Sequence, residues 1–273
     1  MASTDHEHFK TFGFATWRNA LSAEEVRQIE DELMSAMEQA HTARPFDGSE
    51  RHWLPLLTPR TPKIASLAED PRFYEKAKEL VDGDVILMVT DGNRYVTDTP
   101  WHPDGVTGKT SLGVKFFVYL GSLRADTGAL RVVPGSHLEP LHQELGEYAR
   151  RDGVGVDDIP SYSFDCEPGD VLAFDFPIWH ASAGGSKDRR MCTVEYYRKP
   201  SNEEEWAAVK GHFGVVEAVT KDAMKGEGFP FYDPAWVEDP EQSDTRREII
   251  ANMREAGFFA NPANLGRAEP APV

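Results

Sequence analysis

Residues 162–197, YSFDCEPGDVLAFDFPIWHASAGGSKDRRMCTVEYY, determine the class of fold that this sequence predicts. They alternate short segments rich in β-branched and aromatic residues with turns of Gly, Pro and Asp, and this alternation is typical of strands. Segments of this kind lie at 84–90, 112–120, 129–133, 162–165, 171–176 and 190–197. Many short strands without helices between them predict an antiparallel sandwich or barrel, so we expect a mainly β protein.

The sequence on either side of these strands predicts helices. Ser22 and Glu25 have the spacing of a capping box, and apolar residues follow them on one helical face. A second helix is expected to begin after Asp70 as its N-cap residue. Residues 203–213 and 245–256 are also expected to be helical, so helices should pack outside one β-barrel.

No repeat and no low-complexity linker divides the chain, so we expect a single domain over residues 1–273. Its core barrel should span about 84–200, and residues 201–273 should form a helical C-terminal extension. The chain carries 29 Lys and Arg against 46 Asp and Glu, a net charge of −17 that argues against general nucleic-acid binding. No apolar run approaches the roughly 20 residues of a membrane-spanning helix. Cys166 and Cys192 are too few for a disulfide framework, and we expect a cytoplasmic protein, either monomer or homodimer.

Residues 41–63 break both the helical and the strand pattern and contain four prolines. Loops longer than about 12–15 residues are usually functional or disordered, and we expect this one to fold over the barrel mouth as a lid. Its cations would favour an anionic small-molecule substrate in so acidic a chain. These cations are Arg44, Arg51, Arg60 and Lys63. The alternative is a surface loop that Trp53 and the neighbouring leucines pin to the core.

The segment Trp101-His102-Pro103-Asp104 carries the most informative chemistry. Residues i and i+2 of an extended strand point to the same side, so His102 and Asp104 can present an imidazole and a carboxylate together. His180 follows a later strand and could bring a second imidazole to the same point. Two histidines and one carboxylate form the facial triad of non-haem Fe(II) oxygenases. In a chain with nine histidines, a His-x-Asp pair alone is weak evidence for a metal site and favours a structural or surface role.

Further charged and polar residues follow the candidate triad. Arg189 and Arg190 begin a strand, and an arginine near a barrel floor offers a planar fork to a carboxylate such as that of 2-oxoglutarate. Two solvent-facing charges are the alternative. Ser182 lies two residues after His180 and could donate to the same co-substrate. Lys115 would contact substrate or co-substrate if its side of the strand faces inward, and would be ordinary surface otherwise.

At these residues the sequence resembles the phytanoyl-CoA dioxygenase family of Fe(II)/2-oxoglutarate enzymes. The matching elements stand in family order and cover about residues 84–200. They are Trp101-His102-Pro103-Asp104, the run 126–137 with its Pro134-Gly135-Ser136-His137, the turn Gly169-Asp170, His180-Ala181-Ser182 and Arg189-Arg190.

The resemblance implies a double-stranded β-helix, or jelly roll, that holds iron through His102, Asp104 and His180. Arg189 would bind the C5 carboxylate of 2-oxoglutarate with help from Ser182, and Arg190 is the alternative anchor. The expected cofactors are Fe(II), 2-oxoglutarate and O₂, and the expected activity hydroxylates or otherwise oxidises a small molecule, with release of succinate and CO₂. A halogenase on the same scaffold is disfavoured because Asp104 fills the halide position, and a non-catalytic jelly-roll binding protein is the other alternative.

Overall fold

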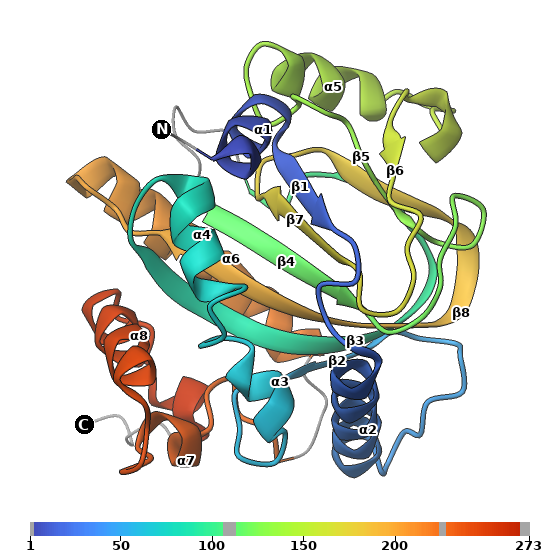
Figure 1. Ribbon diagram of the computed structural model, residues 1–273. Coiled ribbons are helices and arrows are strands. Elements are labelled where there is room, and N and C mark those ends of the chain that lie inside the picture. The colour runs from blue at the N-terminus through green and yellow to red at the C-terminus, as the bar shows by residue number, and fades with distance from the viewer. Residues whose placement is uncertain (1–2, 106–112, 224–227, 268–273) are drawn as a thin grey trace, which may run out of the picture.

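The computed structural model describes residues 3–105, 113–223 and 228–267. Its centre is a curled sheet of antiparallel strands with helices outside it, which is the double-stranded β-helix architecture that the sequence predicts (Figure 1). Among the described residues the sheet has eight strands. They are β1 (Phe14–Trp17), β2 (His52–Pro55), β3 (Val85–His102), β4 (Gly113–Tyr119), β5 (Leu130–Val132), β6 (Tyr162–Ser163), β7 (Val171–Asp175) and β8 (His180–Arg198).

Two long strands connect the two halves of the curled sheet. The main order is β1-β7-β4-β8-β3-β2, and β5 pairs with both β6 and β8. Near its start β8 pairs Ser182 with Leu130 of β5, and near its end it pairs Glu195 with Lys115 of β4. Strand β3 pairs with β8 from Val85 opposite Arg198 to His102 opposite His180. The end of β3 and the start of β8 both contribute residues to a cavity inside the barrel.

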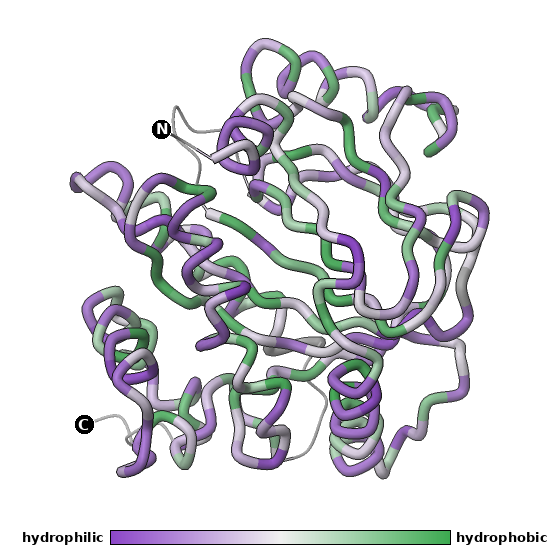
Figure 2. The backbone as a smooth tube through the Cα atoms, in the orientation of Figure 1, coloured by the Kyte–Doolittle hydropathy of each residue, from purple (hydrophilic) through white to green (hydrophobic). Residues whose placement is uncertain are grey.

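Successive residues of a strand face opposite sides of the sheet, and here each side is covered by its own hydrophobic core. On β4, Val114 and Phe116 belong to the large core beneath the helices, whereas Phe117 and Tyr119 belong to a second core inside the barrel. Lys115 shares the inward side with Phe117 and Tyr119. In Figure 2 the central strands accordingly carry hydrophobic stretches interrupted by hydrophilic residues, and the helices around them alternate hydrophobic and hydrophilic residues.

Helices cover the outer side and one end of the sheet. In Figure 1, α2, α3, α4 and α8 lie along the outer side, whereas α1 and α5 lie near the opposite end. The helices of the described residues are α1 (Thr4–Phe12), α2 (Ala23–Ala40), α3 (Pro62–Ser66), α4 (Tyr74–Val81), α5 (Leu141–Ala149), α6 (Glu203–Ala223), α7 (Pro234–Val237) and α8 (Asp244–Glu255). The capping box of Ser22 and Glu25 is present at the start of α2, as predicted.

Several element boundaries differ from those that the sequence predicts. Helix α4 begins at Tyr74, because residues 70–73 form a turn in which the Asp70 carboxylate accepts the backbone N–H of Arg72. Strands β3 and β8 are much longer than expected, and α6 continues well past residue 213. Residues 52–55 are strand β2, paired with β3, where a loop was expected.

The C-terminal segment packs onto the same core as the sheet. Phe213 of α6 and Met253 of α8 are buried together with Val194 of β8. This shared core favours the prediction of one domain, in which residues 201–273 are an extension of the barrel. None of the helices within the described ranges is long and apolar enough to cross a membrane.

Candidate metal centre

The curled ends of β3 and β8 bring the three predicted metal ligands together. His102 is the last residue of β3 and pairs in register with His180, the first residue of β8. Asp104 lies in the following turn, and its backbone N–H donates to the carbonyl of Phe176, 3.0 Å away. One ligand atom from each of the three side chains lies within 4.8 Å of the other two. Asp104 Oδ1 is 3.6 Å from Nε2 of both histidines.

Backbone carbonyls determine which nitrogen of each histidine faces this centre. His102 Nδ1 lies 2.8 Å from the Pro100 carbonyl, and His180 Nδ1 lies 3.0 Å from the Ile178 carbonyl. A carbonyl oxygen only accepts hydrogen bonds, so each Nδ1 carries the proton and donates it. Each Nε2 then faces Asp104. Such an outer contact is the usual way in which proteins orient a metal-binding histidine.

The charge states complete a donor set that fits Fe(II). Burial lowers the pKa of His180 to about 4, so its imidazole is neutral at neutral pH. Burial raises the pKa of Asp104, but Lys115 together with the two histidines outweighs this effect and holds the pKa well below its usual value. Burial lowers the pKa of His102, but its hydrogen bond to Asp104 and the charge of that carboxylate outweigh this effect and raise the pKa above its usual value. Two imidazoles and one ionised carboxylate therefore converge, and a metal ion bound there would displace any proton that His102 holds. This donor set is that of the two-histidine, one-carboxylate triad.

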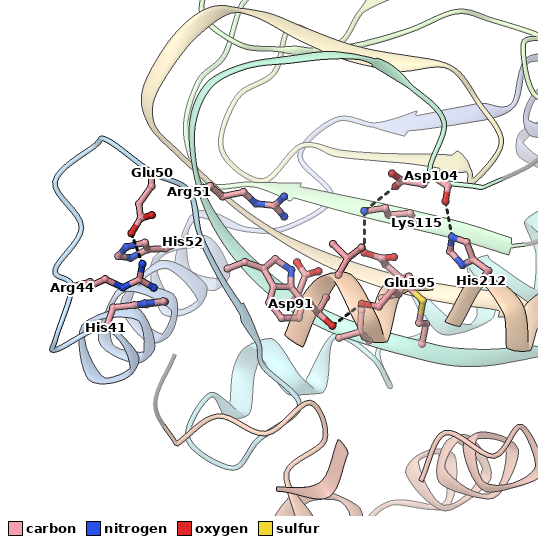
Figure 3. Close-up of a pocket in the computed structure, with 16 residues that line it drawn as sticks. His41, Arg44, Glu50, Arg51, His52, Asp91, Asp104, Lys115, Glu195 and His212 are labelled. Carbon is pink, nitrogen blue, oxygen red and sulfur yellow. Dashed lines mark hydrogen bonds and ion pairs between the residues drawn. The ribbon is translucent and has the colours of Figure 1, made fainter. Parts of the chain in front are cut away.

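Two further residues hold Asp104 from other sides (Figure 3). Lys115 Nζ donates to Asp104 Oδ2 at 3.0 Å and contacts Glu195 Oε1 at 3.1 Å. His212 of α6 donates from Nε2 to the backbone carbonyl of Asp104 at 2.6 Å, and its Nδ1 accepts from the Tyr197 hydroxyl at 2.7 Å. The position of Asp104 thus depends on β4, β8 and the C-terminal helix α6.

A small cavity of about 50 Å³ lies beside the triad inside the barrel, and Arg189 and Ser182 line it. Arg189 is buried, donates to the Gly128 carbonyl at 2.6 Å and lies 4.8 Å from the centre of the Tyr95 ring. Ser182 Oγ is buried and has no hydrogen-bond partner within the described ranges of the chain. A buried cation and an unpartnered hydroxyl beside the donor set suit a carboxylate-bearing co-substrate.

Arg190 points to the other side of the sheet. Its guanidinium forms an ion pair with Glu30 of α2, and Asp188 lies 3.8 Å away. Successive residues of a strand face opposite sides, so only one of the two adjacent arginines can face the cavity. The structure places Arg189 there.

A second, larger cavity of about 340 Å³ opens on the other side of Asp104 and Lys115 (Figure 3). Its floor includes Asp91 of β3 and Glu195 of β8, and α6 contributes Val216 and Thr220. Burial and the nearby Asp91 raise the pKa of Glu195 to about 7, although Lys115 opposes this shift. Residues of the segment 41–53 form the remaining wall.

The predicted lid segment therefore borders the cavity, but its residues divide into two groups. Trp53 and the leucines of the segment are buried in the core, as expected for a loop pinned to the protein. Arg51 lines the cavity, stacks on Tyr95 with 4.0 Å to the ring centre, and donates to the Asn93 side chain. The other predicted cations are engaged elsewhere or paired. Arg44 lines the cavity but pairs with Glu50, Lys63 pairs with Glu25, and Arg60 stacks on Phe229.

Sequence reasoning missed Asp91, Glu195 and His212 as residues of the site. The strand period counted from Arg189 places Thr193 and Glu195 on its side, and this signal could have identified Glu195. The register places Asp91 opposite Thr193 across β3 and β8, a contact that a single sequence does not specify. His212 lies on α6, and no sequence motif indicates that this helix packs against the barrel.

The curled sheet and the histidine–carboxylate cluster define the superfamily of iron- and 2-oxoglutarate-dependent oxygenases. Residues 9–192 match the family described as phytanoyl-CoA dioxygenase (PhyH), and the chain belongs to this family. A comparison with curated protein sequences finds no significant match.

Solved structures of low sequence identity share the fold. HygX from Streptomyces hygroscopicus, with nickel and 2-oxoglutarate bound, is 21% identical with a TM-score of 0.58, over 72% of this chain and 87% of that chain. The carbocyclase SnoK from nogalamycin biosynthesis is 16% identical, with a TM-score of 0.57 over 73% and 85%. EctD from S. alaskensis, with 2-oxoglutarate and 5-hydroxyectoine, is 19% identical, with a TM-score of 0.54 over 73% and 77%.

Proposed function

We propose that this protein is an Fe(II)/2-oxoglutarate-dependent dioxygenase that hydroxylates or otherwise oxidises a small molecule and releases succinate and CO₂. One observation carries the proposal: the Nε2 atoms of His102 and His180 and an ionised carboxylate converge beside a cavity that is lined by a buried arginine and by a serine hydroxyl without a hydrogen-bond partner among the described residues. HygX and EctD share the fold, and their structures contain 2-oxoglutarate. When bound, iron and 2-oxoglutarate supply the oxidant, and the protein supplies orientation and a water-poor pocket.

In this proposal His102, Asp104 and His180 hold the iron, and their carbonyl contacts keep both Nε2 atoms directed at it. Arg189 holds the C5 carboxylate of 2-oxoglutarate through its guanidinium, and the Ser182 hydroxyl donates to the same group. The remaining inner wall, formed by side chains such as Phe117 and Met191, limits the water in the cavity.

The larger cavity is the proposed substrate site, because it reaches Asp104 from the side opposite Arg189. An anionic group of the substrate would lie near Arg51, since Arg44 is already paired with Glu50. Charge reversal at Arg51 should then raise the substrate KM and leave metal binding unchanged. A lid that closes over bound substrate would be cleaved by a protease in the apo protein and protected in the loaded protein.

The test of the proposed function is a screen of small molecules, scored by succinate formed above the background without substrate and followed by mass analysis of the product. An oxygenated, desaturated or cyclised product formed together with succinate supports the proposal. A protein that binds ligands but forms no succinate with any of them would instead be the non-catalytic jelly-roll protein. A halogenated product would indicate the second enzyme class, which Asp104 disfavours.

A further inference from the structure

Lys115 is a partly buried cation at the boundary between the two cavities, with its side chain 18% exposed. Its side chain lines both of them, as does that of Asp104. A lysine charge that is largely withdrawn from water must be compensated. Here the ammonium group has two carboxylate partners, Asp104 at 3.0 Å and Glu195 at 3.1 Å.

The partners fix the place of the ammonium group. In register, Lys115 lies opposite Glu195 on the adjacent strand β8, so the two side chains extend from neighbouring backbone positions to the same side. Glu195 is itself held, because the hydroxyl of Thr193 donates to its Oε1 at 3.1 Å. A lysine with a flexible stem is thereby restricted to one position beside Asp104.

This contact distinguishes the two oxygens of the Asp104 carboxylate. Lys115 occupies Oδ2, whereas Oδ1 is the oxygen that lies 3.6 Å from both histidine Nε2 atoms. We propose that Lys115 is a positioning residue that makes Asp104 offer only Oδ1 to the metal, and so keeps one more coordination position available to the co-substrate. The inference rests on the proposed function, because it assumes that Asp104 is a metal ligand.

Replacing Lys115 by methionine should change the affinities for metal and for co-substrate in opposite directions. In Lys115→Met the cation beside Asp104 is lost, so the carboxylate attracts a divalent cation more strongly, and we expect about tenfold tighter Mn(II) binding. The freed Oδ2 can then also bind the metal and occupy a position that 2-oxoglutarate needs. The affinity of the Mn(II) protein for 2-oxoglutarate should therefore fall by about tenfold, the effect of some 1.4 kcal/mol. A purely structural loss would weaken both.

The experiment is calorimetric titration of the full chain, first with Mn(II) and then with 2-oxoglutarate, without turnover. Lys63→Met is the matched control, since Lys63 is a similarly enclosed lysine paired with Glu25 away from the site, and both of its affinities should equal those of the wild type. Lys115→Gln keeps a donor for Oδ2 without the charge. It should bind Mn(II) more tightly but retain the affinity for 2-oxoglutarate, and it provides the test if Lys115→Met does not fold.

A crystal structure of Lys115→Met with Mn(II) gives the direct readout. The proposal predicts Asp104 bound through both oxygens, against Oδ1 alone in the wild type. Weaker or unchanged Mn(II) binding in both Lys115 variants, or single-oxygen binding in Lys115→Met, would overturn it. A wild-type protein that binds no metal at its triad would instead refute the proposed function itself, before any variant is compared.

Discussion

Replacement of Arg189 by alanine should remove the anchor for 2-oxoglutarate while leaving the metal ligands in place. Arg189 as a whole residue is only 6% exposed, so a carboxylate bound to it would be largely shielded from water. Removing one partner of an enclosed charge pair costs on the order of 2–5 kcal/mol. Part of this cost already falls on the free protein, because the Gly128 carbonyl loses its donor. We therefore expect the KM for 2-oxoglutarate to rise by about ten- to a thousandfold, at about 1.4 kcal/mol per decade.

The assay measures succinate formation against 2-oxoglutarate concentration at saturating iron, and Arg190→Ala is the matched control. Arg190 forms a partly exposed ion pair with Glu30, and exposed pairs contribute about 0–1 kcal/mol, so its loss should leave the KM for 2-oxoglutarate unchanged. Iron content should equal that of the wild type in both variants. A raised KM in Arg190→Ala together with a normal KM in Arg189→Ala would refute the assignment of the anchor.

Three further predictions concern other parts of the site. His212→Phe should weaken metal binding by about tenfold, because the Asp104 carbonyl loses its donor from α6, and an unchanged Mn(II) titration would count against this support. Burial lowers the pKa of His41 to about 4 in the folded protein. As the pH falls, His41 is therefore protonated in the unfolded chain before it is protonated in the folded protein. This difference should lower the free energy of unfolding by on the order of 1–2 kcal/mol from pH 7 to pH 5. In His41→Phe, the free energy of unfolding measured with urea should depend correspondingly less on pH. Turnover of a substrate in the presence of chloride or bromide should give no halogenated product, since Asp104 fills the metal coordination position that a halide needs. A halogenated product found by mass analysis would contradict this prediction.

The sequence predicted those parts of the molecule that local patterns encode. The alternation of strand segments and turns indicated the β-barrel, and the spacing of His102 and Asp104 placed both on one side of a strand. The α2 capping box is a local signal of the same kind. The true lengths of β3 and β8 were not predictable in this way. Polar residues such as Asp91 and Arg189 face the inside of the barrel, and they interrupt the hydrophobic pattern of a strand.

The features that the sequence left open or missed depend on contacts between distant segments. Residues 52–55 contain a proline and follow a polar loop, yet they form an edge strand because β3 offers a free partner. His212 enters the site only because α6 packs over the turn that carries Asp104. For the two adjacent arginines, strand alternation requires that only one face the cavity, but the residue that does so depends on the register with β3, which pairs Arg189 with Tyr95.

The central claim is that His102, Asp104 and His180 hold an iron that is required for turnover of 2-oxoglutarate. Its most direct test is to reconstitute the wild type and His180→Ala with Fe(II) under anaerobic conditions, and to measure iron per chain and succinate formed once O₂ is admitted. The account predicts one iron per wild-type chain with iron-dependent succinate formation, and loss of both in a folded His180→Ala variant. Iron content and succinate formation near the wild-type level in His180→Ala would contradict it.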